Sequence, residues 1–436
     1  MKKLILPVMA SAMLITSCGG ESEKKESKTT EKKEEKKQYT DFDLDNFEEN
    51  GKYGVQVVED GKVLILAQAQ YDYIDRYNNG AAIFGIGEFG NYGKNFSGKM
   101  GVLGLDGKEI IPAKYDFINR FNENGIALVA NGTPDNYGVK DGKYGFINLK
   151  GEEIVPLEYD HVEQSIAEGS WAAKKNGKFG RITTDGEEAV PFEYDYMDRA
   201  FEDLVKVGNG ALNKDGYRLD SGSYGMIDMQ GKIIIPIEYQ DVKTAVQGFV
   251  VVAKGRFENG WLKDAKYGYC DLNGEEVIPC SYSNAYDFNN GLAAVKEPEG
   301  NKYGFINTTG ELVIPYAYDR VDYFGTNLAA VFNYEKSKYG MINRKGELVI
   351  DYIYDQIGGY GRSITKEVKP ADYYVSEGLI SVKKDDKWGY MNETGEVIIP
   401  IEYEDVRWFT EGTAKVKKDG EEFYINPKGE KVAKPE

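Results

Sequence analysis

The sequence is poor in the side chains that most often perform catalysis or bind metals. Its 436 residues include one histidine, His161, and three cysteines. No His-Glu-x-x-His pair, phosphate-binding glycine loop or Gly-x-Ser-x-Gly elbow occurs in it. His161 follows a recurring aspartate and is interpreted as a variable corner residue. We therefore expect a protein that is not an enzyme and that has no metal site and no cofactor.

Positive charge is also in short supply. Lysine and arginine number 54 against 72 aspartates and glutamates, which gives a formal net charge of −18. Such an acidic chain repels phosphate backbones and anionic lipid headgroups. We therefore expect no nucleic-acid partner and no electrostatic membrane binding.

The longest apolar run lies at the start of the chain and is too short to span a bilayer. Lys2 and Lys3 precede the run Leu4–Ile15, an arrangement typical of a secretion signal. The run leads into Leu-Ile-Thr-Ser-Cys-Gly, ending at Gly19, which resembles the lipobox of bacterial lipoproteins. The resemblance implies cleavage before Cys18 and lipidation of that residue, so that acyl chains anchor the protein.

The segment after Cys18 has the composition of a disordered tether. It consists of Gly, Glu, Lys, Ser and Thr without an apolar side chain, so it cannot bury surface. We predict a signal peptide over residues 1–17, a charged tether over 18–38 and a folded body over 39–436. Gly19 replaces the aspartate associated with inner-membrane retention, which favours an outer-membrane lipoprotein of the cell envelope, facing either the periplasm or the surface.

Two cysteines remain in the body, Cys270 and Cys280. They lie on opposite arms of one predicted hairpin but three or four residues out of register, which is beyond disulfide reach. We interpret both as small core residues.

A repeated spacing dominates the rest of the chain. A glycine preceded by a bulky residue is followed eleven positions later by proline, or once by aspartate, and three positions after that by tyrosine. The glycines are Gly101, Gly145, Gly180, Gly225, Gly268, Gly304, Gly340 and Gly389. Eight copies of one spacing describe a single structural unit built repeatedly.

Each copy has the sequence signature of β-structure. Runs of four to six β-prone residues are bounded by Gly, Asn, Asp or Pro, and no 3.6-residue apolar period persists. A second glycine stands six positions after the first, as in Gly310. The residues before it tolerate positive φ badly, so we predict a type I turn closed by a left-handed glycine bulge.

The end of each copy predicts a corner between units. We expect the proline to end the second hairpin arm and the tyrosine to pack under the next unit. An aspartate that often follows the tyrosine is expected to accept backbone N–H bonds as an Asx-turn. One carboxylate for each ~36 residues is too few for a calcium site, which needs six to eight converging oxygens. These aspartates are Asp116, Asp160, Asp195, Asp319 and Asp355.

The combined pattern resembles the WG-repeat family of bacterial proteins. Trp388-Gly389 is the literal dipeptide, while Tyr, Phe or Met replaces the tryptophan in the other copies. The match covers roughly residues 48–430, with degenerate first and last copies that look like capping units. The resemblance implies a repeat architecture and favours binding or scaffolding.

The predicted fold is an all-β tandem array of about ten units, each with three or four strands. Three strands are clear in each unit, and a short fourth runs through Tyr-Asp-x-Val. We expect an elongated, twisted array, because ten units exceed the usual four to eight propeller blades. A closed β-propeller, or a pair of propellers, is the alternative.

Variation between copies points to a candidate binding edge. Four copies lengthen the same connection, over Gly85–Lys99, Asn131–Lys143, Gly208–Ser223 and Gly255–Lys266. A fifth insertion, Gly358–Glu377, precedes its strand. Insertions at one point of a repeat often form a binding face, and exposed aromatic rings bind sugars, peptides and proteins. The candidate ligand-binding residues are Phe89, Tyr92, Tyr137, Tyr217, Phe257 and Trp261.

These observations predict a membrane-anchored, non-enzymatic module that binds an extracytoplasmic protein, peptide or glycan through one looped edge. A structural spacer or assembly protein without a specific ligand is the first alternative. A glycan hydrolase is the second, because two carboxylates suffice for that chemistry and Glu152-Glu153 and Glu275-Glu276 offer pairs.

Replacing the predicted anchor tests the assignment of the first residues. Cys18→Ala should leave the protein unlipidated, because no other nearby residue can form the thioether. The measurement is partition between the detergent and aqueous phases, in which the wild type should enter the detergent phase. A variant that still partitions fully into detergent would refute the lipoprotein assignment.

Overall fold

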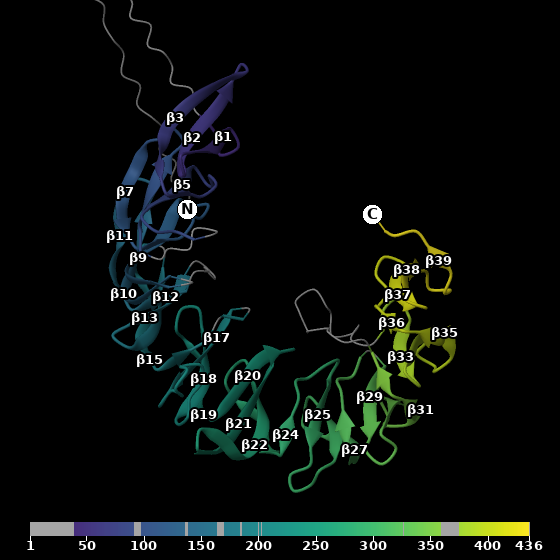
Figure 1. The fold of residues 1–436 in the computed structure, drawn as a ribbon. Helices are drawn as coiled ribbons and strands as arrows, with labels where there is room; N and C mark the ends of the chain where they lie inside the picture. Colours follow the sequence, from purple (N-terminus) through teal and green to yellow (C-terminus); the bar gives the residue numbers. More distant parts are fainter. Residues whose placement is uncertain are drawn as a thin grey trace, which may run out of the picture. The chain divides into compact units, whose positions relative to one another are not determined.

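The computed structural model describes residues 39–90, 97–135, 138–163, 170–183, 185–198, 200–201, 203–325, 327–358 and 375–435. Thr40–Glu436 form one structural unit. The predicted signal peptide, Cys18 and the tether lie outside the described residues. Within those ranges the regular structure is entirely β (Figure 1). No helix in the described part of the chain is long and apolar enough to cross a membrane.

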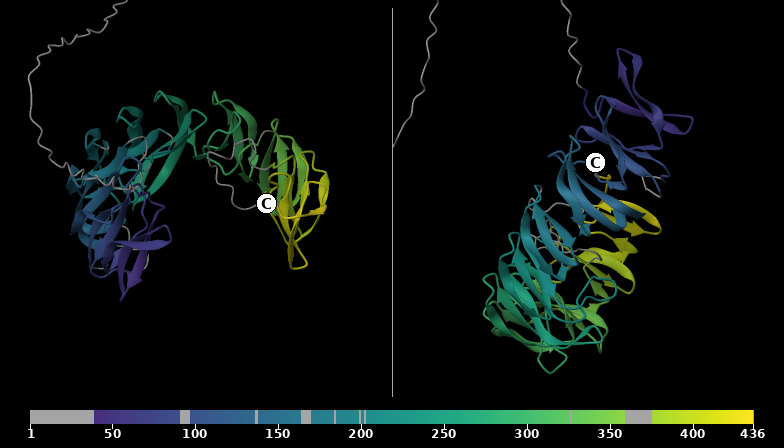
Figure 2. Two further views of the ribbon diagram at one scale, coloured as in Figure 1. Left: turned by 90° about the horizontal axis from the view of Figure 1, so that it is seen from above. Right: turned by 90° about the vertical axis from the view of Figure 1, so that its left-hand side faces the viewer.

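The strands of the described residues form ten separate antiparallel sheets, in agreement with the predicted repeat array. In each sheet the hydrogen-bonded order follows the order along the chain, so each is a meander joined by hairpins (Figures 1 and 2). The first sheet has three strands: β1 (Leu44–Glu49), β2 (Lys52–Glu59) and β3 (Lys62–Tyr71). The other nine have four, and none of the ten closes into a barrel.

The first four of these nine sheets begin with a two-residue strand. They are β4 (Tyr73–Ile74), β5 (Ala81–Ile86), β6 (Lys99–Gly104) and β7 (Glu109–Tyr115); β8 (Phe117–Ile118), β9 (Ile126–Asp135), β10 (Gly138–Asn148) and β11 (Glu153–Tyr159); β12 (His161–Val162), β13 (Ser170–Lys175), β14 (Lys178–Thr183) and β15 (Glu188–Tyr194); and β16 (Tyr196–Met197), β17 (Leu204–Asn209), β18 (Ser223–Asp228) and β19 (Ile233–Tyr239).

The next sheet differs, because its first strand has six residues. It comprises β20 (Asp241–Val246), β21 (Phe249–Glu258), β22 (Trp261–Asp271) and β23 (Glu276–Tyr282). Two-residue first strands then return in β24 (Asn284–Ala285), β25 (Leu292–Lys296), β26 (Tyr303–Asn307) and β27 (Leu312–Tyr318); β28 (Arg320–Val321), β29 (Leu328–Asn333), β30 (Lys338–Asn343) and β31 (Leu348–Tyr354); β32 (Gln356–Ile357), β33 (Ile380–Lys384), β34 (Lys387–Met391) and β35 (Val397–Tyr403); and β36 (Asp405–Val406), β37 (Ala414–Lys418), β38 (Glu421–Ile425) and β39 (Lys431–Val432).

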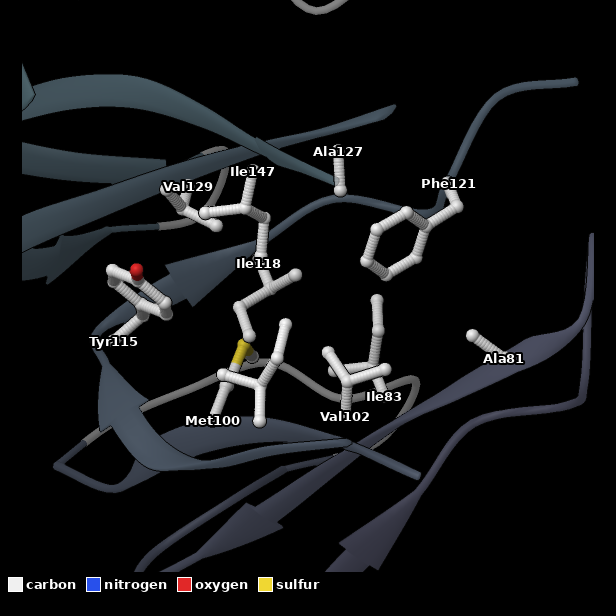
Figure 3. Close-up of a cluster of buried hydrophobic side chains, with 11 residues drawn as sticks. Ala81, Ile83, Met100, Val102, Tyr115, Ile118, Phe121, Ala127, Val129 and Ile147 are labelled. Atoms are coloured by element: carbon white, nitrogen blue, oxygen red, sulfur yellow. The ribbon is translucent and has the colours of Figure 1, made fainter. Parts of the chain in front are cut away.

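The hydrophobic core lies between consecutive sheets. In one cluster, Ile83 and Val102 of the β4–β7 sheet pack with Ile118, Val129 and Ile147 of the β8–β11 sheet (Figure 3). All five side chains are buried. Each sheet therefore buries its apolar side chains against its neighbours, as expected of a repeat protein. Cys270 is fully buried and Cys280 half-buried, and both are free thiols.

The predicted glycine bulge closes the hairpin between the third and fourth strands. All eight turn glycines have positive φ, for example +83° at Gly310, whereas Thr309 before it does not. Gly310 donates its N–H to the carbonyl of Asn307, and the Asn307 side chain accepts N–H bonds from Thr309 and Glu311. The Asx-turn thus forms at this asparagine.

The proline does not end the hairpin arm, contrary to the prediction. Strand β7 continues through Pro112 to Tyr115, and its pairing with β6 shifts register, from Val102 opposite Ile111 to Met100 opposite Tyr115. Because β7 is the outer strand of its sheet, a residue without an N–H costs no ladder bond at this bulge.

The bulge explains the motif glycine. A Cβ at Gly101 would lie 2.5 Å from the carbonyl oxygen of Ile111, the residue before the proline. The same close approach recurs at Gly145, Gly180, Gly225, Gly268, Gly304, Gly340 and Gly389, at 2.4 to 2.7 Å. The motif glycine therefore lies where its backbone crosses the partner strand, directly beside the residue that precedes the proline.

The recurring aspartate joins consecutive sheets. Asp319 forms an ion pair of 2.5 Å with Lys302, which directly precedes β26. Its carboxylate also accepts the N–H of Tyr334, just after β29 of the next sheet, at 2.9 Å. We call this arrangement the Lys–Asp staple. Asp72, Asp160, Asp195 and Asp355 bind a lysine and a backbone N–H in the same way. The aspartate thus accepts an N–H far along the chain, where we had predicted a local turn.

The corner tyrosine also reaches the next sheet, as predicted. Tyr115 is buried beside Ile118 and Val129, and its hydroxyl donates to Glu153 of β11 at 3.2 Å. Tyr71 binds Glu109, and Tyr239 binds Glu276, in the same relation. Burial raises the pKa of each of these three tyrosines.

The backbone crossing predicts a sharp difference between two glycines of β6. Gly101→Ala should destabilise the protein by about 2 kcal/mol or more, because its Cβ would meet backbone and the Phe84 ring. Gly104→Ala is the control, since the atoms nearest to a Cβ there belong to the side chains of Ile110 and Asp106, not to backbone, and none is closer than 3.1 Å. Urea unfolding of both variants provides the measurement. Equal effects would contradict the crossing as the reason for the motif glycine.

The Lys–Asp staple predicts a dependence of stability on acid. The bond from Lys302, followed by that from the Tyr334 N–H, lowers the pKa of Asp319. A lowered pKa means stability that is present above the unfolded-state value of about 4 and is lost as the pH falls through the folded-state value.

Asp319→Asn should therefore cost about 1 kcal/mol at pH 7 and lose its effect as the pH falls below about 4. Urea midpoints measured across this range test the prediction, with Asp215→Asn on an exposed turn as control. A deficit that is equally large at pH 7 and at low pH would argue against the ionic staple.

Candidate binding surface

The four aromatic insertions all connect the second strand of a sheet to the third. The first and third follow β5 and β17, whereas the second and fourth lengthen the β9–β10 and β21–β22 hairpins. The residue directly before the first strand of each sheet accepts a backbone N–H in the insertion: Asp72 from Gly87, Asp116 from Gly132, Asp195 from Gly210 and Gln240 from Gly255. The base of each insertion is thus fixed to the preceding sheet. Most of the fifth insertion, residues 359–374, lies outside the described residues.

In the first insertion the one described candidate covers the sheet. The Phe89 ring is half-buried, stacks on Tyr73 at 5.8 Å between centroids, and lies against Gly85 and Gly98. A ring held there shields a strand edge and presents little surface to a ligand. Tyr92 lies outside the described residues.

The second insertion lengthens a hairpin. Its residues extend β9 and β10, whose pairing continues to Asp135 opposite Gly138. The Tyr144 hydroxyl accepts the N–H of Val139 at 2.9 Å and so fastens the extension to the sheet. Tyr137 lies outside the described residues.

The third insertion is a small folded loop with an exposed ring. Leu212 and Leu219 bridge across it, and Leu219 is buried in the core between the sheets. The Asn213 side chain accepts the N–H of Tyr217 at 2.9 Å, which closes the turn above them. Tyr217 is 80% exposed. The leucines therefore anchor the loop, while the tyrosine points to solvent.

The fourth insertion is a tight hairpin. Asn259 and Gly260 both have positive φ, as a type I′ turn requires, and Glu258 pairs with Trp261 across it. Phe257 is half-buried against the same core cluster as Leu219. Trp261 is 64% exposed. The hairpin therefore buries one aromatic ring and presents the other.

The third and fourth insertions contact each other through Arg218. Its guanidinium lies 4.5 Å from the centre of the Trp261 ring and donates a hydrogen bond to the carbonyl of Gly260. Asp220 packs against Gly260 and pairs with Arg218 at 3.6 Å. These contacts hold Trp261 with one face on the cation while most of its surface remains exposed.

We call Tyr217, Arg218 and Trp261 the aromatic surface. Two of its three members were predicted as ligand-binding residues. Arg218 was missed, although a cation beside an exposed tyrosine is a recognisable signal, because the sequence does not show that the two insertions meet. Phe89 and Phe257 are half-buried and do not belong to this surface.

Comparison with known families assigns the repeat. The model of the WG containing repeat matches residues 100–132, 144–179, 224–256, 267–302, 303–336, 339–363 and 388–421, together more than half of the chain. The chain belongs to the WG-repeat family. The matched segments of this WG-repeat protein leave out Tyr217, Arg218 and Trp261. The aromatic surface is thus an addition to the WG repeats.

Similarity beyond the family is low. No curated protein matches the sequence. Among solved structures, a crystal structure of a eukaryotic initiation factor is 12% identical, covers 70% of this WG-repeat protein and 84% of its own chain, and has a TM-score of 0.31. AztD from Citrobacter koseri is 12% identical, with coverages of 74% and 93% and a TM-score of 0.28. Such low TM-scores carry no argument about function.

Proposed function

We propose that this WG-repeat protein is a lipid-anchored, extracytoplasmic binding module. Cys18 carries the anchor, and the aromatic surface captures a glycan or peptide without chemically changing it. The observation that carries the proposal is the contact between two insertions, which fixes an exposed tryptophan on an arginine beside an exposed tyrosine. Large rings fixed before binding lose little conformational freedom when a ligand arrives.

The surroundings of the surface suit a neutral or partly polar ligand. Ring faces stack on sugar rings and on apolar side chains, while neighbouring polar groups supply hydrogen bonds. Arg256 beside the turn already pairs with Asp264 at 2.7 Å and Glu258 at 3.4 Å. Arg256, Glu258 and Asp264 are therefore paired within the hairpin, which favours recognition by stacking over recognition by charge.

The alternatives have weaker support. A spacer without a ligand does not require exposed aromatic rings, yet the side chains of Tyr217 and Trp261 are 80% and 64% exposed. For a hydrolase, one carboxylate of each predicted pair is engaged in structural bonds: Glu153 accepts the Tyr115 hydroxyl, and Glu276 accepts Lys254 at 2.7 Å and the N–H of Cys280. Bonds of this kind favour the non-enzymatic interpretation.

Removal of the two rings tests the proposal. The full chain, purified in detergent, is screened on glycan and peptide arrays, and the tightest ligand is then titrated. Tyr217→Ala with Trp261→Ala should weaken its capture at least about tenfold, because exposed Trp and Tyr dominate binding hot spots. The melting temperature should barely change, because both rings are mostly in solvent.

Tyr334→Ala is the matched control, since Tyr334 is 63% exposed and lies between β29 and β30, far along the chain from both insertions. Binding should survive this change. An array screen without any ligand, or equal loss from the control variant, would overturn the proposed binding function.

A further inference from the structure

A cavity of about 600 Å³ lies between the β16–β19 and β20–β23 sheets. Its volume is within the range of small-molecule sites. Its walls come from β17, β18 and β20 and from residues beside β16 and β24. Three consecutive repeats therefore contribute to it, and it does not include any residue of the aromatic surface.

Two repeats beside the cavity have alanine at a position that is aromatic in five other repeats. The sixth residue after the corner tyrosine is a buried aromatic at Tyr77, Phe121, Phe288, Phe324 and Phe409. In the two sheets that border the cavity, the corresponding residues are Ala200 and Ala245. Ala200 lines the cavity, and the neighbouring Phe201 is 46% exposed. The cavity wall thus has a small side chain at Ala200 where five other repeats carry an aromatic ring, while Ala245 packs against the neighbouring core cluster.

A bulge in β20 places two polar residues on the wall. Val242 pairs with Val252 and Ala245 with Val250, so Lys243 and Thr244 stand opposite a single residue of β21. A β-bulge redirects side chains in this way and often occurs beside binding sites. Both Lys243 and Thr244 line the cavity.

The wall carries charges of both signs beside apolar surface. Lys206 pairs with Asp241 at 3.2 Å, and Lys243 donates to the carbonyl of Ala285 at 2.7 Å. Asp287 accepts the Tyr323 hydroxyl at 3.3 Å. Apolar wall is supplied by Phe201, Leu204, Met226 and Val242.

Two of these charges lie in surroundings with little water. Burial lowers the pKa of the Lys243 ammonium, and burial raises the pKa of the Asp287 carboxyl, although each charge partly offsets the effect on the other. A ligand that brings an opposite charge to each group would replace lost hydration.

We propose that this cavity binds a small zwitterion with an apolar side chain, an α-amino acid or a dipeptide. The ligand's carboxylate lies at Lys243, its ammonium lies at the aspartates of the wall, and its side chain lies against Phe201, Leu204 and Met226. The two charges of such a ligand match the two signs of charge that the wall presents. The inference goes beyond the proposed function and concerns a different site.

The first test uses calorimetric titration of the full chain in detergent with leucine, phenylalanine and Leu-Leu. At least one should bind with a Kd below about 1 mM. The N-acetyl form and the amide form of the tightest probe should each bind at least about tenfold more weakly, because each lacks one charge. Absence of binding by all three probes, or equal binding of the blocked forms, would overturn the proposal.

Two variants locate the site. Ala200→Phe restores the aromatic found in other repeats and should abolish binding while the melting temperature stays the same or rises. Lys243→Met keeps the length of the side chain and should bring the affinity for the amino acid down to that for its amide. Wild-type binding by either folded variant would place the site elsewhere and reject the inference.

The aromatic surface supplies the control that separates the two proposals. Tyr217→Ala with Trp261→Ala should leave amino-acid binding unchanged. Loss of amino-acid binding in that variant would overturn the cavity as the site. Failure of glycan or peptide capture, with amino-acid binding intact, would instead reject only the proposed function.

Discussion

The close crossing of two backbones in each repeat is the constraint on which the rest of the structure depends. The carbonyl of the residue before the proline lies over the motif glycine, within 2.4 to 2.7 Å of where a Cβ would stand. At the crossing a bulge bends the outer strand, which then continues from the proline for three more residues to the corner tyrosine. That tyrosine and the Lys–Asp staple then connect to the next sheet, so the spacing of the repeat follows from one contact.

The regular part of the fold could be predicted because each of its signals is local. Turn glycines with positive φ, free cysteines and a short strand through Tyr-Asp-x-Val depend on a few neighbouring residues, and all three were confirmed. The short strand begins the next sheet, where a fourth strand of the same unit was predicted. The prediction failed at Pro112, because pairing that resumes after a bulge leaves no mark at the proline itself. The partners of the staple aspartates are 15 to 17 residues away at Asp72, Asp116 and Asp160, so a local interpretation missed them.

The candidate sites could be predicted only in part for the same reason. Aromatic residues in insertions pointed to Tyr217 and Trp261, yet the identical signal at Phe89 marks a ring that covers its own sheet. Whether a ring is exposed depends on small residues beneath it, such as Gly85 and Gly98, and on contacts between insertions. The small side chain of Ala200 in the cavity wall is recognisable as a departure only when the repeats are compared at equivalent positions.

Departures from the repeat are concentrated in two adjacent sheets. Between β16 and β23 the core aromatics become alanines, the first strand lengthens to six residues, and two insertions meet through Arg218. Even the staple changes there: Gln240 replaces the aspartate and Ser223 the lysine, yet Gln240 still binds both Ser223 and the N–H of Gly255. Because the connection between sheets is preserved while the surface and interior change, this pair of repeats combines a conventional scaffold with both candidate binding sites.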